Sequence, residues 1–355
     1  MKKLNLIVLI GAAALFLASC NSSSSTDTST EGNWVKRSSL DGDARFYATS
    51  FVIGNYAYVA TGRAVNNSTY YNLGDLWRYD PSSDSWTQET SLPDGKTLEG
   101  GVGFSIGDNG YVGTGTDGKG NYYSDFYQYS STSNTWTKIA DFPGTARFRA
   151  TGFSVGDKGY VVFGAAGSAY FKDMYAYDPN SDSWTNISTP FIDKKYGGTS
   201  FVIGDDAYLV GGTIGDGSGS GEFWKYNPSS GFTQLRRVEN ATDSSFDDDY
   251  GTVRASLISR TDGVAFAIGS KGYITGGKSS DGGSFSSQTW CYDPTGDKGL
   301  GTWEQRTSYE RHSFYGGVGF NVNGRGFAGL GFAGSSLPYD NLDEFLPTED
   351  YNVND

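Results

Sequence analysis

Histidine and cysteine are nearly missing from this chain, which has one His and two Cys among its 355 residues. A Ser-His-Asp triad would depend on the single His312, so the sequence gives no support for hydrolysis of that kind. Charged residues make up only 19% of the chain, and 40 acidic residues against 27 basic ones give a formal net charge of −13. This acidity argues against nucleic acid as a partner.

Long apolar runs are also missing, with one exception at the N-terminus. Lys2 and Lys3 precede an apolar run over residues 6–17, which is the layout of a secretory signal. Residues 17–20, Leu-Ala-Ser-Cys, resemble a bacterial lipobox, so we expect a signal peptide over residues 1–19 and a lipid on Cys20. A Ser/Thr-rich tether follows over residues 20–32. We therefore expect an outer-membrane lipoprotein, attached to the membrane through its lipid alone and facing the periplasm rather than the cell surface.

Glycine and aromatic residues are abundant, with 51 Gly, 25 Tyr and 22 Phe. Many of them recur in six copies of one pattern: Phe-x-Ile/Val, a Gly/Asn/Asp turn, then Tyr-Val or an equivalent. The copies span residues 51–62, 104–115, 153–164, 201–212, 266–277 and 320–331. Their leading Phe residues are 53, 49, 48, 65 and 54 positions apart, which is the period of a four-stranded propeller blade. Almost no helix is expected.

A second hairpin follows five of the copies. It consists of alternating aromatics, a turn that often contains Asp-Pro, and a closing aromatic residue, as in residues 76–86. Together the two patterns resemble the kelch repeat family over residues 33–347. The resemblance implies an all-β fold, a six-bladed kelch β-propeller that forms one domain, with residues 348–355 as a C-terminal tail.

The position of Trp34 indicates how the ring closes. It precedes Phe51 by 17 residues, the distance that also separates Trp136 from Phe153, yet no inner strands precede it. The last copy has no Trp after it. We therefore expect the N-terminal strand to complete blade six, which would leave no open end of the ring.

One junction is twice as long as the others, because Phe232 and Phe266 are 34 residues apart. The inserted segment, residues 236–255, is acidic and includes Asp243 and three consecutive Asp residues at 247–249. Calcium could use such oxygen atoms, but no EF-hand spacing is present, so a solvated loop is the favoured interpretation. No metal and no cofactor are predicted.

Candidate site residues lie where the inner strands begin, beside one mouth of the central channel. Six positions before the leading Phe, four of the six copies have a cation: Arg45, Arg147, Lys195 and Arg260. Glu99 and Arg311 lie close to this position in the other two copies. A ring of cations could bind a carboxylate or phosphate, because Arg offers a planar fork of donors. The alternative is structural, with these side chains tying blades together through carbonyls or Asp residues.

Aromatic residues recur in the loops of the same face, and Tyr71, Tyr123 and Phe171 are the candidates among them. Flat rings at a rim suit sugar stacking or contact with a partner. The alternative is that each ring packs against the adjacent blade.

Kelch propellers include galactose oxidase-like enzymes, whose copper centre uses two His and two Tyr. With His312 alone, this chain cannot assemble that ligand set. The function that the sequence favours is a non-catalytic monomer that binds a glycan or an envelope protein through its long-loop face. The alternative is a sugar mutarotase or epimerase resembling the sialic acid mutarotases, for which Glu99 and Arg147 are the candidate catalytic residues.

Overall fold

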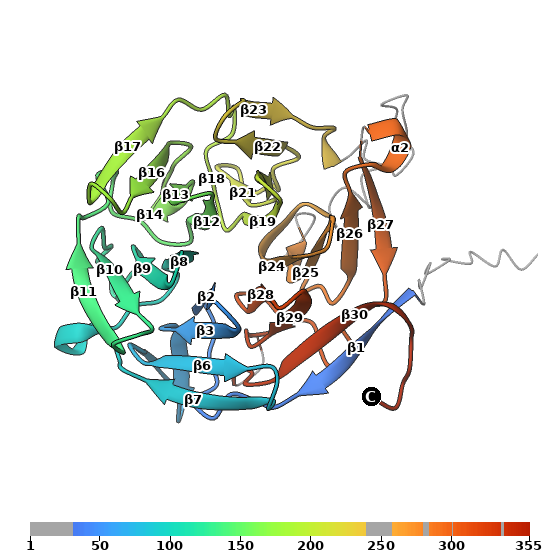
Figure 1. Ribbon diagram of the computed structural model, residues 1–355, viewed down its shortest axis with the longest axis horizontal. Helices are drawn as coiled ribbons and strands as arrows, with labels where there is room; N and C mark the ends of the chain where they lie inside the picture. The colour runs from blue at the N-terminus through green and yellow to red at the C-terminus, as the bar shows by residue number, and fades with distance from the viewer. Residues whose placement is uncertain (1–30, 239–257, 280–283, 300, 335–336) are drawn as a thin grey trace, which may run out of the picture.

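Six antiparallel sheets of four strands stand around a common axis (Figure 1). The protein is described by a computed structural model that covers residues 31–238, 258–279, 284–299, 301–334 and 337–355. The innermost strands of the six sheets contact one another in a closed circle, so each sheet is one blade of a propeller.

Each blade has four strands, which follow one another from the innermost strand at the axis outward. Blade 1 has β2 (Thr49–Ile53), β3 (Tyr56–Ala60), β6 (Leu76–Asp80) and β7 (Ser85–Glu89). Blade 2 has β8 (Val102–Ile106), β9 (Asn109–Gly113), β10 (Phe126–Ser130) and β11 (Thr135–Ile139). Blade 3 has β12 (Thr151–Val155), β13 (Lys158–Val162), β16 (Met174–Asp178) and β17 (Ser183–Ile187).

The other three blades follow the same plan. Blade 4 has β19 (Thr199–Ile203), β20 (Asp206–Val210), β22 (Phe223–Asn227) and β23 (Gly231–Gln234). Blade 5 has β24 (Arg260–Ile268), β25 (Lys271–Ser279), β26 (Thr289–Asp293) and β27 (Thr302–Arg306). Blade 6 has β28 (Val318–Val322), β29 (Arg325–Gly329), β30 (Leu342–Asp350) and β1 (Glu31–Arg37).

The N-terminal strand closes the ring as the sequence predicts. β1 pairs antiparallel with β30, and Trp34 lies opposite Phe345 in the register. The Trp34 side chain is buried, with its ring 4.9 Å from that of Phe345 and 5.0 Å from that of Tyr309. The two chain ends are thereby joined within one sheet, which fixes blade 6 against blade 1.

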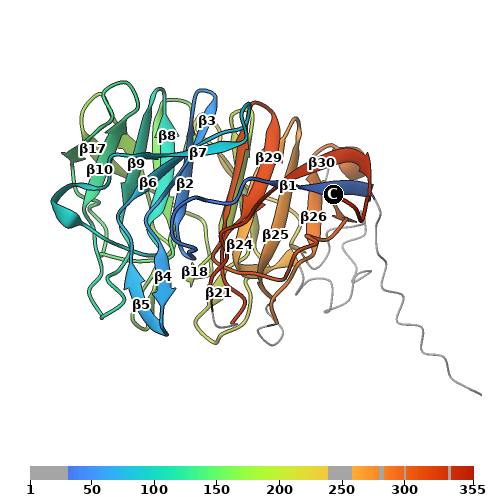
Figure 2. The same cartoon turned by 90° about the horizontal axis from the view of Figure 1, so that it is seen from below.

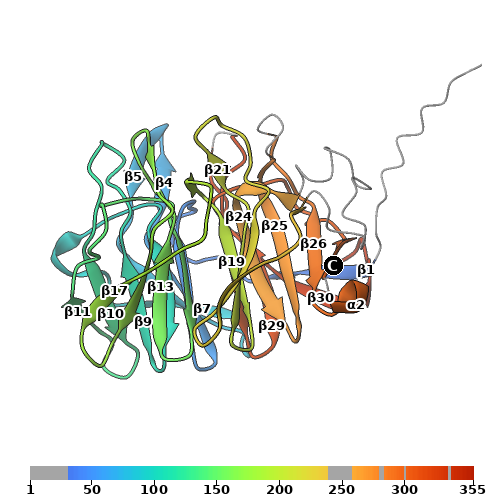
Figure 3. The same cartoon turned by 90° about the horizontal axis from the view of Figure 1, so that it is seen from above.

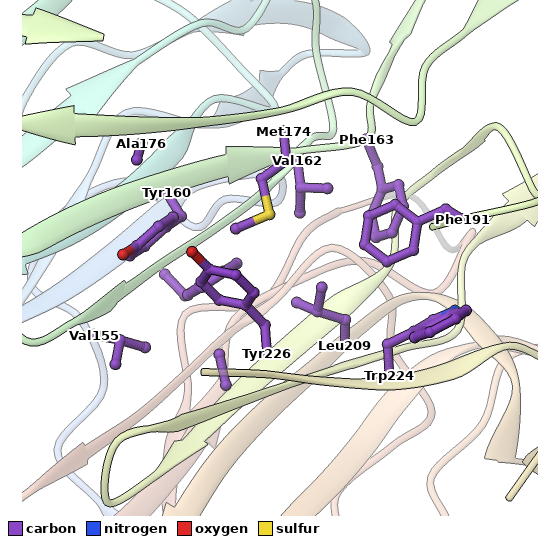
Figure 4. Packing of buried hydrophobic residues seen from close by; sticks show 12 residues of the cluster. Val155, Tyr160, Val162, Phe163, Met174, Ala176, Phe191, Leu209, Trp224 and Tyr226 are labelled. Atoms are coloured by element: carbon purple, nitrogen blue, oxygen red, sulfur yellow. The ribbon is translucent and has the colours of Figure 1, made fainter. Parts of the chain in front are cut away.

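Aromatic packing between neighbouring blades explains part of the repeat pattern. Within blade 3, Phe153 stacks on Tyr160 with the rings nearly parallel. A Cβ added at Gly159 of β13 would lie 2.0 Å from the ring of Phe104 in blade 2, so this glycine makes room for the preceding blade. Figure 4 shows the corresponding core between blades 3 and 4, where Tyr160 and Met174 face Tyr226 and Leu209.

The two faces of the ring differ in the length of their loops. Hairpins within each blade turn tightly on one face (Figure 2). The opposite face has the longer connections and three added pairs of short strands, of which β4–β5 and β21 stand out in Figures 2 and 3. These pairs are β4 (Arg63–Asn66) with β5 (Thr69–Asn72), β14 (Ala165–Ala166) with β15 (Ala169–Tyr170), and β18 (Lys195–Tyr196) with β21 (Thr213–Ile214).

Helix is nearly absent from the part of the chain that the structure describes. Apart from Val238 and Ile258, the helical residues there belong to η1 (Pro93–Gly95) and α2 (Gly296–Gly299), which both contain left-handed residues and amount to tight turns. No helix among these residues is long and apolar enough to cross a membrane. The all-β, six-bladed prediction is confirmed. The predicted signal peptide, the lipidated Cys20, most of the tether and most of the insert over 236–255 lie outside the described residues.

Candidate functional site

Six residues, one from each blade, encircle the channel at the long-loop face. Each lies four positions before the leading Phe and has a φ between 52° and 65°. The backbone N–H of each donates to the carbonyl of its counterpart in the preceding blade, with N···O distances of 2.6–2.9 Å, so the six hydrogen bonds form a closed circle. These residues, named here the mouth ring, are Tyr47, Gly100, Arg149, Gly197, Asp262 and Gly316.

Side chains and glycines alternate around the mouth ring. Blades 1, 3 and 5 supply Tyr, Arg and Asp, while blades 2, 4 and 6 supply glycine. A Cβ added at Gly197 would lie 2.6 Å from Oδ1 of Asp262, and one added at Gly316 would lie 2.8 Å from the ring of Tyr47. The glycines therefore leave the space that the three side chains occupy. Non-glycine residues in this left-handed conformation are uncommon and often occur at functional sites.

Arg149 and Asp262 form an ion pair between blades 3 and 5. Nε of Arg149 donates to Oδ1 of Asp262 at 2.7 Å, and Nη2 donates to Oδ2. The hydroxyl of Tyr47 also donates to Asp262, at 3.1 Å. Burial by itself would lower the pKa of Arg149, but Asp262 and Tyr47 raise it above its ordinary value, so the guanidinium stays charged. Three blades are thus linked through side chains at the mouth.

Glu99 places a second buried carboxyl next to the mouth ring, directly before Gly100. Its Oε1 accepts a hydrogen bond from Nη1 of Arg63 at 2.9 Å. Its Oε2, and Nε of Arg63, have no hydrogen-bond partner among the described residues although both are buried. Burial raises the pKa of Glu99 above its ordinary value, and Arg63 only partly opposes this shift. The pair therefore offers one acceptor and one donor to a ligand hydroxyl.

Aromatic rings from blades 5, 6 and 1 form another side of the mouth. Phe285 stacks on Tyr315 with 5.2 Å between centroids, and Phe46 stacks on Phe332 at 5.0 Å. An edge contact between Tyr315 and Phe46 joins the two pairs. These four residues are named here the aromatic wall. Tyr315 also contacts Tyr47, so the wall continues into the mouth ring.

The predicted ring of cations does not line the mouth. Arg45 and Arg147 are fully buried, and each forms two hydrogen bonds to an Asp of its own blade, Asp75 and Asp173 respectively. Each also donates to a backbone carbonyl after the second strand. The positive φ two residues later turns the chain, so these side chains point into the blade rather than toward the axis. These contacts are of the kind that the structural alternative predicts, and the binding role of both residues and the catalytic role of Arg147 stay predictions.

Lys195, Arg260 and Arg311 also have structural surroundings. Lys195 is fully buried and donates to the Ser220 hydroxyl, and burial lowers its pKa to about 8. Arg260 is buried and donates to two carbonyls, and burial lowers its pKa to about 9. Arg311 pairs with Asp343 on the outer part of blade 6. Each of these three cations thus has a partner within its own blade, and its role in ligand binding stays a prediction.

The three predicted aromatic residues support neighbouring loops. The ammonium of Lys96 lies 3.3 Å from the ring centre of Tyr123, and the guanidinium of Arg147 lies 4.2 Å from that of Phe171. The hydroxyl of Tyr71 donates to Asp43. Phe171 also lines a separate surface cavity of about 520 Å³ beside Tyr170 and Lys194. Glu99 is thus the one predicted site residue that the structure places at the mouth.

The candidate residues chosen from the sequence did not include Arg63, Arg149, Asp262 or Lys278, although Arg149 and Asp262 lie only two residues beyond Arg147 and Arg260. A signal for two of them is present, since the position four before the leading Phe alternates between glycine and Tyr, Arg or Asp. Arg63 lies just after β3, the second strand of blade 1, and Lys278 lies near the end of β25, the second strand of blade 5. The importance of both positions depends on how the loops fold over the mouth.

The fold and the closed circle of repeats define this chain as a six-bladed kelch β-propeller. A family model described as N-acetylneuraminate epimerase matches residues 90–216. A solved structure described as "Structure of YjhT" superposes with a TM-score of 0.67 at 13% identity, covering 86% of this chain and 95% of that one. A search of curated proteins gave no match. At this identity the structural likeness shows the fold alone.

Proposed function

We propose that the long-loop mouth binds a reducing sugar and accelerates the interconversion of its anomers, with acidic sugars of the N-acetylneuraminate kind as substrates. The observation that carries the proposal is the buried Glu99, whose Oε2 has no partner among the described residues. The family-model match adds support, because residues 90–216 include both Glu99 and Arg149.

Mutarotation needs one base, and it leaves the composition of the sugar unchanged. Glu99 takes the proton of the anomeric hydroxyl while the bond between the anomeric carbon and the ring oxygen breaks and solvent protonates that oxygen. The open-chain sugar then rotates, and the reverse steps close the ring on the other face of the carbonyl. A raised pKa suits Glu99 for this exchange, because a base with a pKa closer to the working pH also returns its proton readily. Arg63 keeps the carboxylate in place.

A glycan-binding module without catalysis is the second candidate. The side chain of Tyr70 favours it: the ring is 47% exposed at the rim, with the guanidinium of Arg63 4.6 Å from its centre. Such a ring is a platform on which a sugar can stack.

We further propose that the domain acts in the bacterial envelope as a lipid-anchored protein. Palmitate labelling that depends on Cys20 would test this proposal.

The two candidates differ in the fate of a freshly released anomer. We expect the purified protein to accelerate conversion of α-N-acetylneuraminate to the β-anomer, followed by proton NMR. Glu99→Gln should lower the protein-dependent rate by roughly 10²–10⁴-fold, because the amide cannot accept the proton. Arg78→Ala, which removes an Arg–Glu pair on the side of blade 1 near the hairpin face, is the matched control and should leave the rate unchanged.

The pH dependence gives an independent readout. Only the ionised carboxylate acts as the base, so the protein-dependent rate should fall as pH drops through the raised pKa of Glu99, above the ordinary value of 4.5. Binding without any acceleration at any pH would favour the non-catalytic candidate. If the protein neither binds the sugar nor accelerates its mutarotation, both candidate functions are refuted.

A further inference from the structure

Three cations lie near the mouth, namely Arg63, Arg149 and Lys278. Arg63 pairs with Glu99, and Arg149 pairs with Asp262. Lys278, near the end of β25, interacts electrostatically with both Asp262 and Arg149. Among the residues that the structure describes, Lys278 forms no salt bridge and no side-chain hydrogen bond. It is therefore the one of these three cations that no described carboxylate pairs with.

The aromatic wall holds the Lys278 ammonium in place without neutralising it. Nζ lies 4.0 Å from the ring centre of Tyr315 and 5.7 Å from that of Phe285. Tyr315 and Phe285 are stacked on each other, which fixes the surface on which the ammonium rests. A cation on aromatic faces is attracted by the ring quadrupoles but keeps its full charge and its N–H donors. Burial lowers the pKa of Lys278, while Asp262 opposes that shift.

We propose that Lys278 is the specificity-determining residue that holds the carboxylate of an acidic sugar at the mouth. This inference rests on the proposed function and names the group that selects its substrate. The two arginines of the mouth already have protein carboxylates as partners, so a ligand carboxylate would have to share them. Lys278 offers a point charge and N–H donors that no described carboxylate uses, and a ligand carboxylate would pair with it directly.

The geometry also has a consequence for the reaction. In sugars of the N-acetylneuraminate kind the carboxylate is bonded to the anomeric carbon. A carboxylate held at Lys278 thus fixes the position of the reacting carbon at the mouth. Sugars that lack the carboxylate would bind without this orientation.

The test compares N-acetylneuraminate with its methyl ester, which has the same shape but no charge. We expect wild-type protein to bind the acid roughly 10- to 100-fold more tightly than the ester, as for a hydrogen bond to a charged group. Lys278→Gln should lower affinity for the acid to that of the ester and leave affinity for the ester nearly unchanged. Lys278→Arg should keep most of the preference, because it keeps the charge.

Lys271→Gln is the matched control for net charge. Lys271 is on the same strand, about 23 Å away at seven residues of extended chain, and pairs with Asp293. The Lys271→Gln variant should keep the full preference for the acid over the ester. Equal loss of acid and ester binding in Lys278→Gln, or a preference that survives the substitution, would overturn the proposal.

The same measurements separate this inference from the proposed function. Glu99→Gln should lose the acceleration and keep the preference for the acid over the ester. If wild-type protein prefers the acid through Lys278 but does not accelerate mutarotation, the proposed catalysis fails and the carboxylate site stands. If mutarotation is accelerated equally for acid and ester, the proposed function stands and the role of Lys278 is wrong.

Discussion

Arg147 and Arg149 are two residues apart in blade 3, yet they belong to different regions of the molecule. Arg147 is fully buried and bonds to Asp173 of its own blade. Arg149 lies at the channel mouth and bonds to Asp262 of blade 5. In a regular strand both side chains would share one face, but the positive φ of Arg149 breaks the alternation. One region holds each blade together, and the other joins blades into a site.

Removing Arg147 should have the largest effect on stability. Arg147→Ala breaks a buried ion pair and empties the space between Phe142 and Phe171, whose rings lie 4.8 and 4.2 Å from the guanidinium. We expect a loss of about 3 kcal/mol in the free energy of unfolding, at the lower end for buried pairs because Asp173 is partly exposed. Urea denaturation of the variant and the wild-type protein measures this loss. A loss below about 1 kcal/mol would contradict the structural role.

Removing Arg149 should affect the site instead. Arg149→Ala leaves Asp262 with the hydroxyl of Tyr47 as its partner, and we expect the protein-dependent rate of mutarotation to fall roughly 10- to 100-fold. Arg147→Ala, assayed where it is still folded, should retain most of this rate. The comparison between the two arginines fails if both variants lose the same fraction of activity per folded molecule.

Adding one methyl group, the smallest of these changes, should lower the rate of mutarotation at the mouth ring but not at an ordinary turn. Gly197→Ala adds a Cβ that meets Asp262 at φ +65°, whereas Gly204→Ala adds one at φ +59° where no atom lies within 4 Å. Both should cost about 1 kcal/mol of stability from the left-handed backbone. Only Gly197→Ala should also lower the rate, because it displaces the ion pair between Arg149 and Asp262. Equal rates for the two variants would show that the mouth ring tolerates distortion.

Most of the fold could be predicted from the sequence, because each blade repeats the same solution to the same packing problem. The spacing of Trp34 even indicated which strand closes the ring. The residues of the candidate site were harder to predict, also because the blades repeat. A cation that recurs in four of six blades, such as Arg45 or Lys195, serves something that every blade needs, namely the bonding of its own loop.

Residues that act on a ligand need not recur, because a ligand at the axis meets each blade differently. The position occupied by Tyr47, Arg149 and Asp262 varies while its backbone conformation does not. The repeats therefore located the segment that contains the mouth ring, two residues from its side chains. Arg63 and Lys278 depend on loop packing over the mouth, which periodicity alone does not encode.

A crystal structure of the protein with N-acetylneuraminate would show directly where the ligand lies. We expect the sugar above the mouth ring, with a hydroxyl within hydrogen-bond distance of Oε2 of Glu99 and the carboxylate at Nζ of Lys278. A sugar bound instead in the surface cavity beside Phe171 and Lys194, with the mouth empty, would contradict it.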